Sequence, residues 1–166
     1  TADYVPIIRK EMQSFLKFLL AMKKPARILE VGTAVGFSAI LMAEYDPVPC
    51  QITTIENYEK RIPIARENFK RAGKEAQIAL LEGDAAEGPY DFIFMDAAKG
   101  QYIHFLPEIL RLLAKDGVLV SDNVLQDGDV IESRFAVTRR NRTIHKRMRE
   151  YLYTLTHSEE LVTAVL

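Results

Sequence analysis

Short apolar runs alternate with helix-like segments along this chain, and this alternation constrains its fold more than any other feature. The apolar runs read as strands at residues 27–32, 51–56, 77–81, 92–96 and 117–122. Apolar residues recur at helical spacing between them, near residues 8–20, 37–43, 58–72 and 104–114. Strands that are almost continuously apolar are typical of a parallel sheet with helices on both faces. The sequence therefore predicts an α/β fold with an open, doubly wound, mostly parallel, Rossmann-like sheet.

The length and charge of the chain suit one domain without an overall preference for nucleic acid or lipid. The chain has 166 residues, which favours a single domain with a substantial core. Its 22 basic and 23 acidic residues give a net charge of −1, so any attraction for polyanions must be local. Cys50 is the only cysteine, which excludes an internal disulfide and favours a reducing compartment, the cytoplasm. No apolar run is long enough for a membrane span, and the first residue, Thr1, leads us to expect that the native start precedes it.

The connection between the third and the fourth predicted strand is too short for a parallel sheet. Only about six residues separate the third predicted strand from the fourth, which starts near Tyr90. A parallel crossover takes at least 10–12 residues. We therefore expect a helical segment near residues 86–88 to be missing from the sequence, so that consecutive numbering hides a break.

The first strand-to-helix turn, EVGTAVGFS, contains the residues expected to bind a cofactor, namely Glu30, Gly32, Gly36 and Ser38. In open α/β sheets ligands bind beyond the carboxyl ends of the strands, and glycines let them approach the backbone. Glu56 ends the second strand, where a carboxylate can accept both hydroxyls of a ribose. The turn lacks the dinucleotide pattern G-x-G-x-x-G and has no phosphate-binding lysine, so it favours S-adenosylmethionine. Purely structural glycines are the alternative.

A second group of polar residues follows the third, fourth and fifth strands. Asp84 could accept a hydrogen bond from the adenine amine, although a solvated turn aspartate is an equal alternative. Asp96, Asp122 and Asn123 offer oxygen ligands that suit Mg²⁺, or else Mn²⁺ or Ca²⁺. Lys99 could take or stabilise a substrate proton beside such a cation. Helix capping by the two aspartates is the alternative reading.

These motifs together resemble a known family. The patterns ExGTxxGxS, an acid after the second strand, GDA, DAxK and DN occur in order from about Ile28 to Leu125. They are similar to those of the metal-dependent class I O-methyltransferases of the caffeoyl-CoA and catechol type. Within that family, DAAKGQY and DNVL look most like the bacterial branch that methylates 5-hydroxyuridine in tRNA.

The resemblance implies a role for each matched position. Glu30, Gly32 and Ser38 would line the methionine part of the cofactor. The remaining roles would be ribose binding by Glu56, adenine binding by Asp84, contact with cofactor and metal by Asp96, metal binding by Asp122 and Asn123, and catalysis by Lys99. The resemblance also implies a homodimer, and a further strand after one expected at residues 161–166.

The segment 134–149 is strongly basic. It holds seven cationic residues and no acid: Arg134, Arg139, Arg140, Arg142, Lys146, Arg147 and Arg149. Apolar residues at helical spacing should face inward there: Ile144, Met148, Tyr151, Leu152 and Leu155. An outward basic face would bind phosphates and so suits tRNA. A solvated helix face, salt bridges in a dimer, or a small acidic substrate such as an acyl-CoA thioester are alternatives.

Two classes of function follow from these observations. The first is a metal-assisted O-methyltransferase acting on a hydroxyl of a tRNA base, with a small catechol-like or CoA-linked phenolic substrate as its variant. The second is a non-catalytic RNA-binding protein that retains a cofactor pocket. Tyr102 could pack beside the substrate or in the core, and the three histidines have no metal-ligand spacing.

Overall fold

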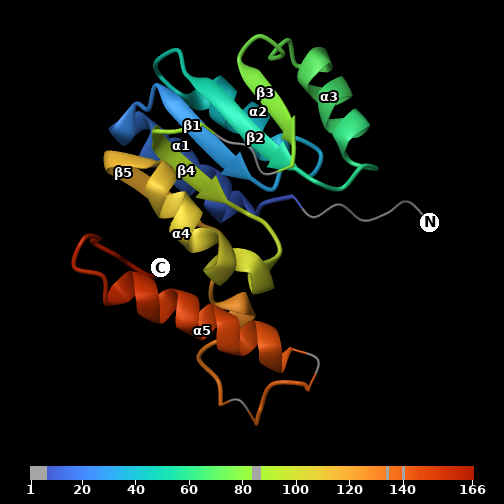
Figure 1. Cartoon of the computed structure of the whole chain (residues 1–166). Coiled ribbons are helices and arrows are strands. Elements are labelled where there is room, and N and C mark those ends of the chain that lie inside the picture. Colours follow the sequence, from blue (N-terminus) through green and yellow to red (C-terminus); the bar gives the residue numbers. More distant parts are fainter. Residues whose placement is uncertain (1–6, 84–86, 134, 140) are drawn as a thin grey trace. The chain divides into compact units, whose positions relative to one another are not determined.

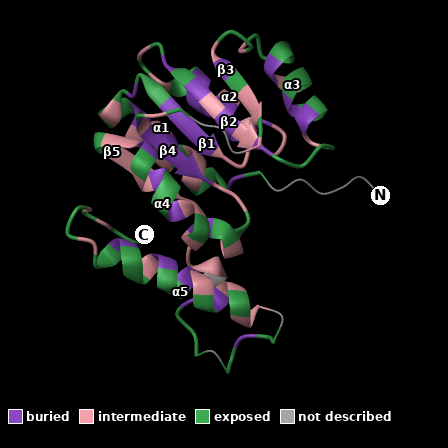
Figure 2. Ribbon diagram, in the orientation of Figure 1, coloured by how far each residue is buried: buried purple, intermediate pink, exposed green. Residues whose placement is uncertain are grey.

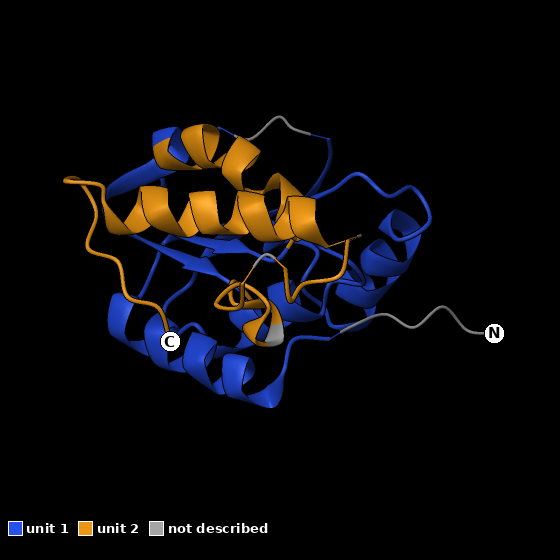
Figure 3. Ribbon diagram, turned by 90° about the horizontal axis from the view of Figure 1, so that it is seen from below, with its two compact units in different colours: residues 1–96, 111–122 blue, residues 97–110, 123–166 orange. Residues whose placement is uncertain are grey.

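The computed structural model describes residues 7–83, 87–133, 135–139 and 141–166 (Figure 1). The chain forms two compact units (Figure 3). Unit 1 comprises residues 1–96 and 111–122, and unit 2 comprises residues 97–110 and 123–166. None of the helices in the described ranges has the length and apolar character that a membrane crossing requires.

Unit 1 contains a five-stranded parallel sheet of order β3-β2-β1-β4-β5. The strands are β1 (Arg27–Val31), β2 (Gln51–Glu56), β3 (Ile78–Glu82), β4 (Tyr90–Met95) and β5 (Leu113–Ser121). The helices α1 (Lys10–Lys23), α2 (Phe37–Tyr45) and α3 (Ile62–Arg71) precede or connect the first three strands. The predicted α/β fold with a parallel sheet is confirmed.

The two inner strands β1 and β4 are largely buried, whereas the edge strands β3 and β5 are more exposed (Figure 2). On one face, Leu16 and Leu20 of α1, Met42 of α2 and Phe69 of α3 join strand residues such as Ile28 in a single hydrophobic cluster. Leu29 and Ile93 point to the opposite face, because side chains alternate along a strand, and they are also fully buried. The inner strands are therefore covered on both sides, as their apolar sequences predict.

Helix α3 begins later than predicted, at Ile62 instead of residue 58. The backbone N–H groups of Asn57 and Tyr58 donate to the carboxylate of Glu56, which holds them outside the helix. Pro63 then lies in the first turn of α3, where its missing N–H costs nothing. The local sequence is helix-forming, but the side chain at the end of β2 decides where the helix starts.

Unit 2 contains the 3₁₀ segments η1 (Lys99–Gln101) and η2 (Gln126–Gly128), helix α5 (Arg142–Thr156) and most of helix α4 (Tyr102–Leu112). In α5, Met148, Tyr151 and Leu155 are buried, as the helical spacing predicts. The prediction of a strand at residues 161–166 is wrong. A strand needs a hydrogen-bonded neighbour, and these residues pair with no strand of the described chain. Instead, the hydroxyl of Thr163 donates to the carbonyl of Leu155 at 2.9 Å.

The connection from β3 to β4 is short for the topology it serves. Strands β2 and β1 lie between β3 and β4 in the sheet, and all are parallel. Glu82 ends β3, yet the carbonyl of Glu87 accepts a hydrogen bond at 2.7 Å from Arg27, the first residue of β1. Five residue steps span at most about 18 Å when fully extended, so they leave little freedom for a path along the sheet and across it.

We therefore keep the prediction that the natural chain contains a further segment near residues 86–88; residues 84–86 lie outside the described ranges. A crystal structure of the natural protein should show additional residues, with a helix, between β3 and β4. Continuous electron density that joins Glu87 directly to Gly88 would contradict it.

Candidate active site

The turn between β1 and α2 has an unusual backbone that three residues make possible. Gly32, Ala34 and Gly36 all have positive φ angles, of 104°, 49° and 87°. The N–H groups of Gly32 and Thr33 both donate to the carbonyl of Ile55 at 3.1 Å, which ties the turn to β2. Because Ala34 adopts a conformation that L-residues avoid, the surrounding bonds must hold the turn in place.

Gly36 is required by packing as well as by its backbone angle. A β-carbon at this position would lie 2.5 Å from Cε1 of Phe69, a buried residue of α3. The neighbouring Asn68 donates its side-chain amide to the carbonyl of Val35 at 2.8 Å. Helix α3 therefore fixes the outer side of the turn. The sequence-based role of Gly36 in cofactor approach stays a prediction, beside this structural one.

Glu30, the last residue but one of β1, lies at the centre of a buried hydrogen-bond network. Its two carboxylate oxygens accept hydrogen bonds from the hydroxyls of Ser38 in α2 and Thr54 in β2. The hydroxyl of Thr54 is in turn 2.6 Å from that of Thr33 in the turn. Glu30 and Thr54 are fully buried, and Ser38 and Thr33 are nearly so. Two predicted cofactor residues, Glu30 and Ser38, are thus brought together.

Burial raises the pKa of Glu30 to about 7, because the carboxylate loses its hydration. Hydrogen bonds from Ser38 and Thr54 lower it in part, and the negative charges of Asp96 and Glu56 raise it further. The carboxyl ends of β1, β2 and β4 therefore place Glu56 and Asp96 close enough for their charges to act on Glu30. Such a cluster favours a positively charged ligand.

Glu56 accepts three backbone hydrogen bonds and is almost fully buried. Its Oε2 accepts from Ala34 N–H at 2.8 Å, and its Oε1 accepts from Asn57 and Tyr58 N–H at 3.1 and 3.0 Å. Since a carboxylate has about four acceptor positions, Glu56 has room for about one further donor. Receiving both hydroxyls of a ribose would require it to release at least one of these amides.

Asp96 and Asp122 occupy equivalent positions at the ends of neighbouring strands. Met95 pairs with Ser121 in the β4–β5 register, and each aspartate follows directly. Asp96 N–H donates to Val31 and Asp122 N–H to Met95, both at 3.0 Å. Both side chains are half-buried. The prediction that parallel strand ends bring these two aspartates side by side is consistent with this register.

The third predicted metal ligand, Asn123, follows Asp122 directly and has a positive φ of 50°. It is exposed and belongs to unit 2. Among the described residues, no three or more histidine, cysteine or acidic side chains form a group that could hold a metal. The predicted set contains only two carboxylates besides its amide, so the metal site stays a prediction.

Lys99 lies in η1 and donates a hydrogen bond to the phenol oxygen of Tyr102 at 2.9 Å. Tyr102 is fully buried and packs edge-on against Tyr151 of α5, with ring centroids 5.4 Å apart. The core-packing interpretation of Tyr102 therefore holds, while its hydroxyl positions the ammonium of Lys99. Asp84, the predicted adenine ligand, lies outside the described residues.

Several basic residues of α5 hold the preceding segment through its backbone. Arg142 donates to the carbonyl of Val137, His145 to that of Glu132, and Arg149 to that of Val130, at 3.4, 3.1 and 3.5 Å. Arg147 donates to the carbonyl of Gly100 at 3.1 Å. Lys146 and Arg139 are exposed, whereas Arg134 and Arg140 lie outside the described residues. The basic segment thus has a structural role that the sequence analysis did not predict.

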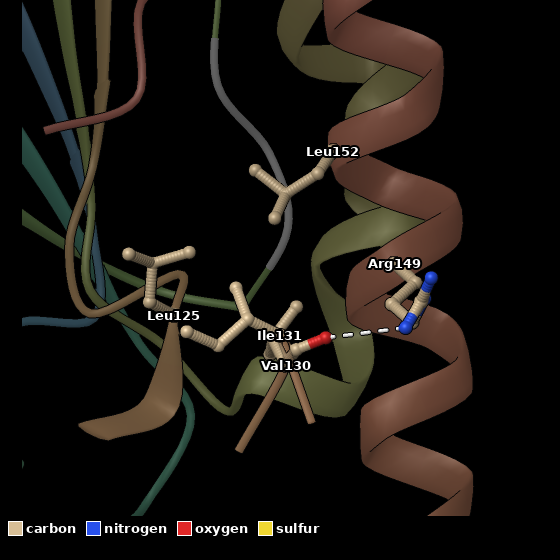
Figure 4. Close-up of a pocket in the computed structure, with 5 residues that line it drawn as sticks. All are labelled: Leu125, Val130, Ile131, Arg149 and Leu152. Carbon is tan, nitrogen blue, oxygen red and sulfur yellow. Dashed lines mark hydrogen bonds between the residues drawn. The ribbon is translucent and has the colours of Figure 1, made fainter. Parts of the chain in front are cut away.

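An open hollow of about 360 Å³ lies in unit 2, between α5 and the segment that contains η2 (Figure 4). Its lining is apolar apart from one arginine: Leu125, Val130, Ile131, Leu152 and Arg149. Leu125 is two residues beyond Asn123, so one short segment contributes both to the hollow and to the predicted metal site. The sequence did not predict this hollow.

Thr33 and Thr54 are the site residues that sequence reasoning missed. A signal was present, because Thr54 lies between Ile52 and Glu56 on the inward face of β2, where a polar residue needs a partner. The sequence does not show that this partner is Glu30 of another strand.

Comparison with known proteins identifies the family. The family model described as O-methyltransferase matches residues 4–159. The chain belongs to the O-methyltransferase family. A catechol O-methyltransferase of Niastella koreensis is 34% identical over 71% of this chain, and a caffeoyl-CoA O-methyltransferase of Stellaria longipes is 29% identical over 69%.

A solved member of this fold, the methyltransferase of Podospora anserina with bound S-adenosylhomocysteine, matches with a TM-score of 0.81. It is 28% identical, and the match covers 92% of this chain and 72% of that one. The chain spans 58% and 53% of the length of the two relatives named above. The comparisons thus establish the family and the fold of this chain.

A first prediction concerns Gly36 and its contact with Phe69. We expect Gly36→Ala to lower the free energy of unfolding by about 2–5 kcal/mol, since it combines a left-handed backbone angle with overpacking. Gly73→Ala is the matched control, because Gly73 has φ 65° but nothing within 4 Å of an added β-carbon. It should cost about 1 kcal/mol. Urea unfolding measures both, and equal losses would contradict the packing role of Gly36.

A second prediction concerns the ionisation of Glu30. A folded-state pKa of about 7 against an ordinary value of 4.5 means that the folded protein holds this proton more tightly. The stability linked to Glu30 is therefore complete below pH 4.5, falls as the pH rises to about 7, and then levels off. The unfolding free energy of Glu30→Gln minus that of the wild type should rise by about 3 kcal/mol between pH 4 and pH 8. Urea unfolding across this range tests it, and a constant difference would mean that Glu30 titrates normally.

Proposed function

We propose that this protein transfers a methyl group from S-adenosylmethionine to a hydroxyl oxygen on an aromatic ring. The observation that carries the proposal is the acidic cluster of Glu30, Glu56 and Asp96 at adjoining strand ends. A carboxylate cluster repels a pyrophosphate but suits a cofactor that carries a sulfonium and an ammonium group. The S-adenosylhomocysteine bound to the Podospora anserina protein supports this choice.

We assign the cofactor residues by the family resemblance. Glu30, Gly32 and Ser38 would position the methionine part, with Gly36 shaping the same turn. Glu56 would receive the ribose, Asp84 the adenine, and Asp96 would contact both cofactor and metal. The turn that ties Gly32 and Ala34 to β2 supports these assignments, because it gives the cofactor a rigid surface.

We also propose that a divalent cation, Mg²⁺ or else Mn²⁺ or Ca²⁺, binds Asp96, Asp122 and Asn123. The two carboxylates at neighbouring strand ends and the adjacent amide are the oxygen donors that such cations prefer. Bound there, the cation would lower the pKa of the acceptor hydroxyl and hold its oxygen. Lys99, held by Tyr102, would stabilise or take the released proton.

The chemistry of the transfer is simple to state. The acceptor hydroxyl gives up its proton, and its oxygen forms a bond to the methyl carbon. The bond from that carbon to sulfur breaks as the new bond forms, so the cationic sulfonium becomes a neutral thioether. The protein contributes mainly by aligning the two reactants.

A small phenolic or CoA-linked acceptor is the first candidate substrate, because the relatives named above are catechol and caffeoyl-CoA O-methyltransferases. A hydroxyl of a tRNA base, 5-hydroxyuridine, is the second. The exposed Arg139, Lys146 and Arg149 favour it, as phosphates would bind such a surface. By the family resemblance we also propose a homodimer.

Methyl transfer from labelled S-adenosylmethionine to a catechol and to bulk tRNA, each with and without a chelator, tests these proposals. We expect transfer that stops when divalent cations are removed. Transfer that survives full removal would contradict the metal role. Activity on catechol alone would exclude tRNA, and activity on tRNA that falls steeply with salt would favour it. Cofactor binding without transfer to either acceptor would favour a non-catalytic role.

A third prediction separates metal binding from cofactor binding. Asp122→Asn should lower methyl transfer by about a hundredfold or more, because an amide binds a divalent cation far more weakly than a carboxylate. The dissociation constant for S-adenosylhomocysteine should change less than about twofold. Asp116→Asn is the matched control, since Asp116 is an exposed residue of β5, the strand that Asp122 follows. Equal loss of transfer and cofactor binding in Asp122→Asn would mean that Asp122 acts on the cofactor instead.

A further inference from the structure

Thr54 connects the buried acid of β1 to the turn that follows it. Glu30 and Thr54 are direct partners in the β1–β2 register, so their side chains lie on the same face of the sheet. Thr54 donates its hydroxyl hydrogen to Oε2 of Glu30, and its oxygen lies 2.6 Å from the hydroxyl oxygen of Thr33. Both threonines have almost no exposed surface. No water can therefore replace either partner without a rearrangement.

The order of the hydrogens in this chain of bonds follows from valence. When Glu30 is ionised its carboxylate can only accept, so in that form both Ser38 and Thr54 must donate to it. Thr54 has one hydroxyl hydrogen, and it is used for Glu30. Thr33 must therefore donate to Thr54, which fixes the rotamer of the Thr33 hydroxyl. In this ionised form the three groups make a relay with one direction, in which each bond polarises the next.

This relay holds the turn from its inner side. Thr33 lies between Gly32 and Ala34, which both have positive φ, so the backbone there keeps its form only while surrounding bonds fix it. The backbone of Thr33 bonds to Ile55, and its side chain bonds to Thr54. Both anchors come from β2. Loss of the Thr54 hydroxyl would leave Thr33 and Glu30 each with an unmet hydrogen bond in a buried place.

We propose that Thr54 is a positioning residue for the cofactor, which acts through Glu30 and Thr33 to hold residues 32–36 in the form that receives the methionine part of S-adenosylmethionine. This inference rests on the proposed function. Thr54 itself touches no ligand, because it is fully buried beneath the turn. A merely structural role would make Thr54 matter for stability and leave the cofactor affinity of the folded protein unchanged.

Two variants of Thr54 in the full chain separate the effect of its hydroxyl from the effect of its shape, and a third variant is the control. Thr54→Val keeps the branched shape and removes the hydroxyl, whereas Thr54→Ser keeps the hydroxyl and removes the methyl group. Thr53→Val is the matched control, because Thr53 is the adjacent residue of β2 and points to the other face of the sheet. The probe is S-adenosylhomocysteine, titrated calorimetrically at a temperature where every variant is folded.

We expect Thr54→Val to raise the dissociation constant about tenfold, as a broken buried hydrogen bond predicts. Thr54→Ser and Thr53→Val should stay within about twofold of the wild type. A Thr54→Val protein that melts at a lower temperature but binds the probe as the wild type does would overturn the positioning role alone. A wild type that binds no probe would overturn the proposed function and this inference together.

If Thr54→Val does not fold, Thr33→Val tests the same relay from its other end. It removes the donor to Thr54 and leaves the bond between Thr54 and Glu30 intact. We expect weaker probe binding, and Thr33→Ser should restore it. Unchanged binding in Thr33→Val would overturn the inference.

Discussion

The buried carboxylate of Glu30 is the interaction on which the rest of this site depends. It lies near the end of the central strand β1, and its two oxygens join that strand to α2 through Ser38 and to β2 through Thr54. Burial alone makes its charge unfavourable, and the nearby charges of Glu56 and Asp96 add to that effect. Such an arrangement weakens the fold at neutral pH, and strongly perturbed acids of this kind concentrate at functional sites. A cationic ligand would offset much of the electrostatic repulsion between Glu30 and these two acids.

The strands and most helices could be predicted because their sequences agree with the tertiary structure. β2 occupies the predicted residues 51–56, since its interior consists of β-branched residues and an acid, Glu56, ends it. The start of α3 could not be predicted, because the backbone amides before it bond to Glu56. The prediction of a strand at residues 161–166 was wrong because tertiary contacts decide this element too. High strand propensity has no effect without a neighbouring strand to pair with.

Some features of the site could also be predicted from the sequence, whereas others are visible only in the fold. Asp96 and Asp122 follow from the rule that parallel strands end at one edge, and the observed register agrees with it. The contact of Gly36 with Phe69 and the relay from Thr33 through Thr54 to Glu30 join residues far apart in the chain. The residue types in these contacts indicate a glycine turn and buried polar groups, but not which residues pair. Pairing between distant positions is information that a single sequence does not contain.

Helix α5 donates hydrogen bonds to three main-chain carbonyls of the segment before it, through Arg142, His145 and Arg149. Because these bonds involve the backbone, they do not depend on which side chains the segment carries, although Val130 and Val137 are buried as well. Residues such as Ile131, which is largely exposed, can be exchanged during evolution at little cost to folding. Exchange at such a position would reshape the hollow that this segment lines together with α5, while the hydrogen bonds that hold the segment stay the same.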